Sequence, residues 1–388
     1  MASVNAIEAI PQGGTARELA RRVLIHGPIS RADLGRQLDL SPASLTRLSK
    51  PFLDRGIFVE GPATRRGAHR PTRPLDIRVD AARFAGVKIT GDGASGVITD
   101  LRAGPLAEAS RSLPSQEVDD VVAAVAALVA ELDRAAPGAP LAGLGVSLGG
   151  HVSDDGDVTR APFLGWRHVA LSTALESATG LPTTVENDVT ALTIAEQWFG
   201  ALRDAGSFAV VTVGAGVGYG LVVHDQVVRT PNTGLGLGGH IPLVADGPLC
   251  PDGHPGCSTA MLSAPSIVAR ATERLGRQVT YEEVLRLAAE GHPDMREITN
   301  SAGRALGRLL GYVTNLAMVD AVVLAGEGIT LWDVAAPAAL EQLDADRDPD
   351  ATPVRIEVDD AGFTAWARGA AAVAVTAALR SLRLPAGT

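Results

Sequence analysis

Residues 239–257 read GHIPLVADGPLCPDGHPGC, and this stretch holds both cysteines of the 388-residue chain. It combines histidine and cysteine side chains, the usual zinc ligands of proteins, with a carboxylate that could bind through oxygen. His254 is an alternative fourth ligand, and a loop that holds no metal is the competing interpretation. The pattern favours a structural zinc site with four ligands: His240, Cys250, Asp252 and Cys257.

Composition excludes several classes of protein. The chain is long enough for two or three domains, and 46% of its residues are hydrophobic. No apolar run approaches the roughly 20 residues needed to span a bilayer, and the N-terminus lacks the pattern of a signal peptide. Two cysteines within one loop are not a disulfide framework. We therefore expect a cytoplasmic protein without membrane contact.

Charge is unevenly distributed along the chain. Residues 1–80 carry 13 Arg or Lys and 8 Asp or Glu, whereas the whole chain has a formal net charge of −10. A basic N-terminal part on an acidic body suggests that an anionic partner meets the N-terminal part. A mildly basic small domain without such a partner is the alternative.

The N-terminal part contains three apolar-periodic segments with short breaks between them. They cover residues 17–26, residues 31–38 and a stretch that begins at Ser41-Pro42. Ser30 and Ser41 are suitable N-caps, and proline is favoured in the first helical turn. The link between the second and third segments is only Asp39-Leu40-Ser41, with Ser41 as the N-cap of the third, which predicts a helix-turn-helix.

A hairpin is expected directly after these helices. Residues 57–60 and 75–79 read as strands on either side of a turn-rich segment with several arginines. Helices followed by such a hairpin form a winged helix, although a helical bundle with a solvated basic loop is the alternative. Side chains of types that contact bases and phosphates lie on the third helix and the wing. The expected DNA contacts are Ser44, Thr46, Arg47, Lys50, Arg65, Arg66, Arg70 and Arg73.

From about residue 81 the pattern alternates between strands and helices, as in an α/β fold with mixed sheets. Asn187 and Asp188 follow a predicted strand and precede a helix, a position where α/β proteins bind ligands. Capping of that helix explains Asp188 equally well. Residues 214–220, GAGVGYG, could bring backbone amides to a phosphate, but a tight hairpin is the commoner explanation.

The order of these motifs resembles the ROK family (repressors, open reading frames, kinases) over nearly the whole chain. SRADLGRQLDLS at 30–41 and RRGAHRP at 65–71 resemble the DNA-binding head of its repressors. The loop after His240 resembles the family's zinc loop, with Asp252 in place of one cysteine. The resemblance implies a homodimer or higher homo-oligomer on operator DNA. The domains it implies are a winged helix-turn-helix at 1–80 and a two-lobed actin-like body, with lobes at 81–200 (completed by a helix at 364–382) and 201–363.

The resemblance also implies a sugar site. In the family's sugar kinases the residues matching Asn187 and Asp188 hold the sugar, and the aspartate is the catalytic base. A carbohydrate or sugar-derived effector is therefore expected. The effector-binding residues implied are Gly150, Asn187, Asp188, Gly236 and His240.

Several residues depart from the kinase pattern. Lys88 stands where the family's kinases have the aspartate that organises Mg²⁺, and Asp92 stands where they have a threonine beside the phosphates. Like charges at ~4 Å cost on the order of 1 kcal/mol even in water, so phosphorylation is disfavoured. Leu237 and Thr259 replace two sugar-binding glutamates, which predicts weak hexose binding or a less polar effector.

We expect a transcriptional regulator that represses, senses a sugar without phosphorylating it, and is not an enzyme. One alternative is a constitutive DNA-binding protein with a vestigial pocket. The other is an ATP-dependent sugar kinase with an appended head, which Lys88 and Asp92 disfavour.

Overall fold

The computed structural model describes residues 14–63 and 73–381 and divides the chain into two compact units. The first unit contains the chain up to Leu148, the segment Val152–Glu186 and the chain from Ala367 onward. The second contains Gly149–His151 and Asn187–Trp366. No helix within the described ranges is long and apolar enough to cross a membrane.

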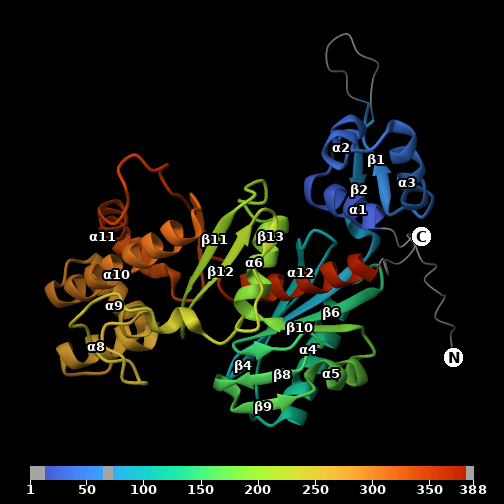
Figure 1. The fold of residues 1–388 in the computed structure, drawn as a ribbon. Helices are drawn as coiled ribbons and strands as arrows, with labels where there is room; N and C mark the ends of the chain where they lie inside the picture. Colours follow the sequence, from blue (N-terminus) through green and yellow to red (C-terminus); the bar gives the residue numbers. More distant parts are fainter. Residues whose placement is uncertain (1–13, 64–72, 382–388) are drawn as a thin grey trace. The chain divides into compact units, whose positions relative to one another are not determined.

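The first unit begins with the predicted helix-turn-helix and hairpin (Figure 1). The side chain of Ser30 accepts a hydrogen bond from the amide of Asp33, and that of Ser41 accepts one from Ser44, so both predicted caps are confirmed. The rings of Phe52 and Phe58 stack with centroids 4.5 Å apart and help to join the third helix to the hairpin. The elements are α1 (Gly14–His26), α2 (Arg31–Leu38), α3 (Pro42–Asp54), β1 (Phe58–Glu60) and β2 (Leu75–Ile77).

A five-stranded mixed sheet follows, with strand order β10-β6-β3-β4-β5. β3 pairs antiparallel with β4 and parallel with β6, so the predicted mixed sheet is confirmed. The strands are β3 (Arg83–Ile89), β4 (Gly93–Thr99), β5 (Pro105–Ser112), β6 (Leu141–Leu148) and β10 (Thr183–Asn187).

Helices cover both faces of this sheet. Residues that pair across neighbouring strands lie on the same face of the sheet. Gly86 and Val97 therefore share one face, and Val87 and Gly96 share the other. Val97 packs on the C-terminal helix, whereas Gly96 approaches Leu128 and Leu132 of α4, so the two helices lie on opposite faces. The helices of this unit are α4 (Val118–Ala135), α5 (Leu171–Thr179) and α12 (Phe363–Ser381). Sequence reasoning missed α5 and a small sheet made of β7 (His151–Val152), β8 (Val158–Ala161) and β9 (Trp166–Val169).

The second unit contains another five-stranded mixed sheet, ordered β13-β12-β11-β14-β15. In β11, Ala209, Val211 and Val213 belong to one hydrophobic cluster with the long helix α10. Phe208 and Val210 belong to a different cluster, which includes Leu192 of α6. This alternation places helices on both faces. The strands are β11 (Phe208–Val213), β12 (Val217–Val223), β13 (Gln226–Val227), β14 (Ala321–Ala325) and β15 (Arg355–Val358).

Six helices accompany this second sheet, and sequence reasoning predicted only the first of them. The helices are α6 (Asp188–Phe199), α7 (Ser258–Leu262), α8 (Ala264–Leu275), α9 (Tyr281–Ala289), α10 (Pro293–Ala317) and α11 (Trp332–Ala345).

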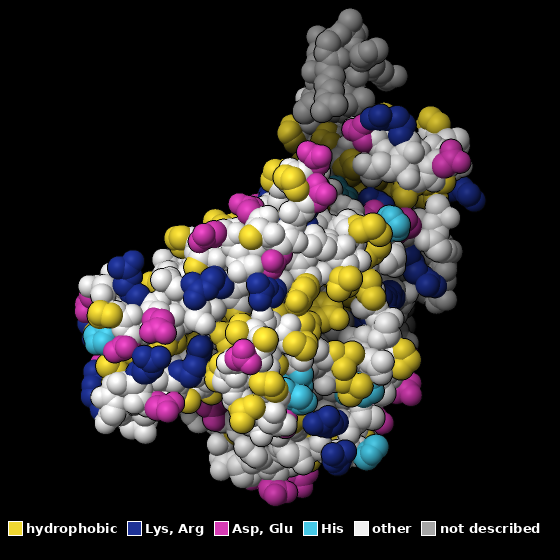
Figure 2. Space-filling model, turned by 60° about the vertical axis from the view of Figure 1, so that its left-hand side comes forward, with side chains coloured by type: hydrophobic (Ala, Val, Ile, Leu, Met, Phe, Trp, Pro, Cys, Tyr) yellow, Lys and Arg dark blue, Asp and Glu magenta, His cyan; other side chains and the backbone are white. Residues whose placement is uncertain are grey.

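On the face drawn in Figure 2, Lys and Arg side chains are interspersed with Asp and Glu, without one large patch of a single sign.

Candidate functional site

The loop between His240 and Cys257 brings three of the predicted metal ligands together. The Nδ1 atom of His240 lies 3.8 Å from the Sγ atoms of both Cys250 and Cys257. One ligand atom from each of these residues lies within 4.8 Å of the other two. Ligands bound to zinc at roughly 2.0–2.3 Å lie about 3.3–3.8 Å apart, so the two nitrogen–sulfur distances are within the range of a zinc site.

Short backbone hydrogen bonds close this loop. The amide of Cys250 donates to the carbonyl of His254 over 3.0 Å, and the amide of Gly256 donates to Pro248 over 2.8 Å. Gly256 has a φ of +52°, and a Cβ there would overlap the carbonyl of Val244. The glycine therefore allows the chain to return and place Cys257 beside the other ligands.

Asp252 lies near the three ligands but on the far side of the imidazole. Its Oδ2 atom is 3.3 Å from Nε2 of His240, the ring nitrogen opposite the one that faces the sulfurs. His254 offers another donor, because its Nδ1 lies 3.6 Å from Sγ of Cys250. The fourth ligand position predicted for Asp252 therefore stays a prediction, with His254 as the alternative.

The two thiols differ in acidity. Desolvation opposes ionisation of Cys250, but hydrogen bonds from His254, Asp252 and Cys257 together outweigh it and lower the pKa of Cys250 to about 6. Burial raises the pKa of Cys257, and the neighbouring Cys250 sulfur adds to that rise. Because the thiolate is the form that binds metal, Cys250 is prepared for ligation at neutral pH.

The predicted effector residues Asn187 and Asp188 lie at the junction of β10 and α6. Asn187 caps the helix by accepting a hydrogen bond from Thr190, and its Nδ2 atom donates to the carbonyl of Gly150 over 2.9 Å. Asp188 accepts a hydrogen bond from the amide of Val189 through Oδ1 over 2.9 Å. The structure thus brings Gly150, Asn187 and Asp188 together and assigns the N-cap role to Asn187.

Gly236 precedes and His240 ends the short turn of Leu237–His240, which packs on β12. The Cβ position of Gly236 meets no atom within 4 Å, and Leu237 is 59% exposed. The hydroxyl of Thr259 donates to the carbonyl of Gly239 over 2.7 Å. Thr259 therefore ties this turn to α7, whereas His240 directs its Nδ1 toward the cysteines.

In the glycine segment 214–220, residues 214–216 make the turn from β11 into β12, and Val213 pairs with Val217. An acidic residue that sequence reasoning missed lies against it, because the amide of Ala215 donates to Oε1 of Glu327 over 2.7 Å. Its position between two glycines directly after a buried strand, β14, signals a turn but does not reveal the contact with Ala215.

Two of the residues that depart from the kinase pattern, Lys88 and Asp92, lie at and just after the end of β3. Lys88 is only 6% exposed and pairs in register with Ser95 and Ser147. Asp92 lies exposed in the turn after the strand and accepts a hydrogen bond from the hydroxyl of Thr90 over 2.7 Å.

Four predicted DNA contacts lie on α3. Thr46, Arg47 and Lys50 are exposed, and Ser44 is half-buried. The Thr46 hydroxyl donates back to Pro42, and the ammonium of Lys50 lies 2.8 Å from Asp54. No hydrogen bond or ion pair engages Arg47 within the described part of the chain. Of the four predicted wing contacts, Arg73 is described and exposed, whereas Arg65, Arg66 and Arg70 lie outside the described residues.

Comparison with known proteins places these features in a family. The chain is 26% identical to the DNA-binding transcriptional repressor Mlc of Escherichia coli (strain K12), with 75% of each protein covered. It is 23% identical to the xylose repressor of Bacillus subtilis (strain 168), with 79% of this chain and 80% of that protein covered. Alignments with the curated relatives span 61–80% of those proteins.

Solved structures share the fold. A ROK family transcriptional regulator described as a homologue of E. coli Mlc superposes with a TM-score of 0.80 at 23% identity, covering 96% of this chain and 99% of that one. A ROK family glucokinase from Streptomyces griseus gives a TM-score of 0.66 at 24% identity, covering 76% of this chain and 99% of that one. The family model for ROK matches residues 84–377. Because this match covers most of the sequence, the chain belongs to the ROK family.

Proposed function

We propose that this chain is a DNA-binding transcriptional repressor whose body binds a carbohydrate without phosphorylating it. The observation that carries the proposal is the helix-turn-helix head, which presents Arg47 on α3 without a partner in the described chain. A solvent-exposed arginine at this place is free to contact a base edge or a phosphate. Relatives named as a DNA-binding repressor and a xylose repressor support both parts of the proposal.

The DNA-binding domain is assigned to residues 1–80. Arg47 is its central contact, because the hydroxyl of Thr46 and the ammonium of Lys50 already have partners within α3. The remaining contacts proposed for this domain are Ser44, Thr46, Lys50, Arg65, Arg66, Arg70 and Arg73.

The effector is proposed to bind in the body that follows the head, at the start of α6, which belongs to the second compact unit. The hydrogen bond between Asn187 and Gly150 supports a built site at the start of α6. Lys88 and Asp92 support binding without phosphoryl transfer, since Lys88 cannot replace a magnesium-organising aspartate and Asp92 cannot replace a hydroxyl that binds phosphate. The proposed effector contacts are Gly150, Asn187, Asp188, Gly236 and His240.

A constitutive DNA-binding protein with a vestigial pocket is the second candidate. Two observations favour it: Leu237 points largely to solvent, and the Thr259 hydroxyl is engaged by the backbone of Gly239. Neither side chain supplies the carboxylate that would bind two sugar hydroxyls. This candidate predicts DNA affinity that no metabolite changes.

A structural zinc ion is proposed for the loop, held by His240, Cys250 and Cys257 with Asp252 or His254 in the fourth position. The convergence of one imidazole and two thiols supports it. When bound, zinc would fix the loop that carries Gly236 and His240. A homodimer is proposed as well, because two heads match the two halves of a palindromic operator.

Selection of genomic DNA fragments by the purified full-length protein tests the proposal. The selection is repeated with a panel of pentoses, hexoses and amino sugars, and with Arg47→Ala as a matched control. We expect a discrete palindromic site that one carbohydrate releases or tightens and that the control loses. A discrete site whose binding no carbohydrate of the panel changes favours the vestigial pocket. Failure to select any DNA site contradicts the proposal.

A further inference from the structure

Two glycine turns lie against each other at one end of the second sheet. β11 and β14 are parallel neighbours, so the turns after Val213 and after Ala325 leave the sheet at the same edge. The amide of Gly328 donates to the carbonyl of Val213 over 2.9 Å. Gly326 has a φ of +105°, and a Cβ there would collide with the backbone of Val213. Glycine at this position lets the two backbones meet.

Glu327 projects from the second turn onto the first. Its Oε1 atom accepts the amide hydrogen of Ala215 over 2.7 Å. A Cβ on Gly214 would overlap the Glu327 carboxylate, so this carboxylate lies directly on the glycine loop. Ala215 and Glu327 are both exposed, which means that the contact occupies the solvent side of the loop, where a ligand would approach.

The turn that carries Glu327 is held from a third element. The hydroxyl of Tyr281, at the start of α9, donates to the carbonyl of Gly328 over 2.7 Å. Burial raises the pKa of Tyr281, and the charges of Glu282 and Glu327 add to the rise, so the hydroxyl keeps its proton. Glu327 therefore extends from a fixed backbone.

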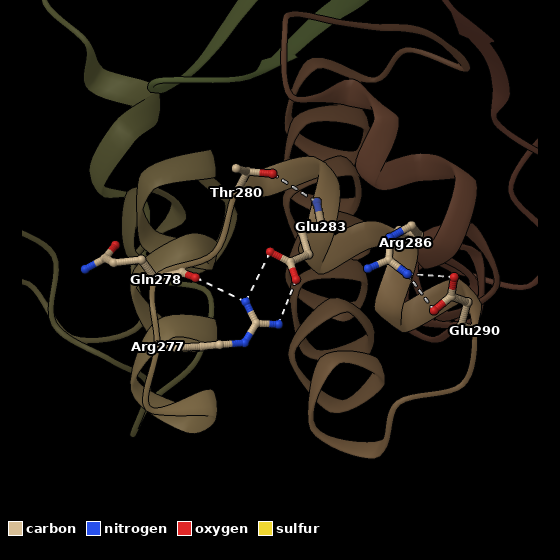
Figure 3. Close-up of polar contacts among 6 residues, drawn as sticks. All are labelled: Arg277, Gln278, Thr280, Glu283, Arg286 and Glu290. Carbon is tan, nitrogen blue, oxygen red and sulfur yellow. Dashed lines mark hydrogen bonds and ion pairs between the residues drawn. The ribbon is translucent and has the colours of Figure 1, made fainter.

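Figure 3 shows how the start of α9 is fixed. The hydroxyl of Thr280 accepts a hydrogen bond from the amide of Glu283, which caps the helix. Arg277, in the loop before the helix, donates to both carboxylate oxygens of Glu283 and to the carbonyl of Gln278. These contacts set the place of Tyr281 and, through it, of the Glu327 turn.

We infer that the Glu327 carboxylate is an internal anion that occupies the anion-binding face of the glycine loop and makes the loop reject phosphate groups. A backbone amide that faces a carboxylate is not available to a phosphate oxygen, and the negative charge repels a second anion. The inference deepens the proposed absence of phosphoryl transfer. It adds a second reason why the chain would not transfer phosphate, located in the second unit and independent of Lys88 and Asp92.

Binding of inorganic pyrophosphate and of ADP to the full-length chain tests the inference. Titration calorimetry compares the wild type with Glu327→Ala and Glu327→Gln at constant ionic strength set with chloride. Glu282→Ala is the matched control, because it removes an equal charge that also acts on Tyr281 but does not contact the loop. We expect Glu327→Ala to bind both probes at least about tenfold more tightly than the wild type, and the control to match the wild type.

Glu327→Gln keeps the size of the side chain and an oxygen that can accept the hydrogen bond from the amide of Ala215. Its gain in affinity for the probes should therefore be smaller than that of Glu327→Ala. If Glu327→Ala does not fold, the glutamine variant carries the test, with any gain above the control as support. Folded variants that bind the two probes no more tightly than the wild type does would overturn the inference. Operator affinity measured on the same samples distinguishes the two proposals. A wild type that fails to bind DNA counts against the proposed regulator function but not against the role inferred for Glu327.

Discussion

At the scale of single residues, Asp252 lies beside the three converging side chains of the proposed zinc loop. Its carboxylate contacts Nε2 of His240, while Nδ1 of the same ring faces the two sulfurs. A carboxylate on the far nitrogen of a metal-binding histidine orients the ring and raises its basicity without touching the metal. This geometry gives Asp252 a role in the loop even if His254 is the fourth ligand.

Metal analysis separates these roles. Cys257→Ser should abolish stoichiometric zinc, because it removes one of three converging donors. Asp252→Asn should keep one zinc per chain but weaken its affinity by about 10–100-fold, the usual effect of losing an outer partner. Competition with a chromophoric chelator measures both. Loss of zinc in Asp252→Asn as complete as in Cys257→Ser would show that Asp252 is a ligand, as the sequence predicted.

Arg47 is the residue on α3 whose loss should weaken DNA binding most. Arg47→Ala should reduce operator affinity by about 1–3 kcal/mol, the typical contribution of a good arginine–base contact. Lys50→Ala should cost less, because its ammonium is already paired with Asp54. Fluorescence anisotropy with operator DNA measures both, and Arg22→Ala, paired with Glu18 on α1, is the control. Equal affinities for Arg47→Ala and the control would reject α3 as the contact surface.

At the scale of elements, α12 packs closely on the first sheet because glycines face it. A Cβ on Gly86 would overlap the backbone of Ala367, and one on Gly145 would overlap the carbonyl of Ala370. Small residues on both sides let the backbones of helix and sheet approach without intervening side chains. The C-terminal helix is thereby bound to the unit that carries the head.

Gly145→Ala should lower the free energy of unfolding by about 1–3 kcal/mol, the usual cost of forcing an extra methyl group into a packed contact. Chemical denaturation of the full chain measures it. Gly14→Ala is the control, since a Cβ at Gly14 meets nothing within 4 Å. A stability for Gly145→Ala equal to that of the control would mean that α12 packs elsewhere.

The elements that could be predicted from sequence are those whose signals are local. Ser30 and Ser41 mark helix starts through their own side chains, and both were found. The contact of Glu327 with Ala215 joins residues 112 positions apart and depends on the parallel pairing of β11 with β14. Neither periodicity nor spacing reveals such a pairing, which is why the glycine loop was recognised and its acidic partner was not.

At the scale of the whole molecule, Arg102 joins the head to the first sheet within one compact unit. Its guanidinium donates to the carbonyls of Val23, Leu24 and Gly27 at the end of α1. It also lies 2.6 Å from Asp76 on β2. The turn that carries Arg102 receives a hydrogen bond from Arg368 of α12 to the carbonyl of Ala103. A displacement of α12 therefore has a continuous path to the head.

Arg102→Ala should uncouple the head from the body. Removing charge-assisted hydrogen bonds of this kind costs about 1.5–3 kcal/mol each at most, and less here because the side chain is partly solvated. We expect the head to exchange its amide hydrogens faster, operator affinity to stay within a few-fold of the wild type, and the response to the effector to be lost. Hydrogen exchange and operator binding with and without effector measure these effects, with Arg111→Ala, paired with Glu131, as the control. Faster hydrogen exchange in the head would establish that the contact is broken. An effector response as strong in Arg102→Ala as in the control would then show that the signal reaches the head by another route.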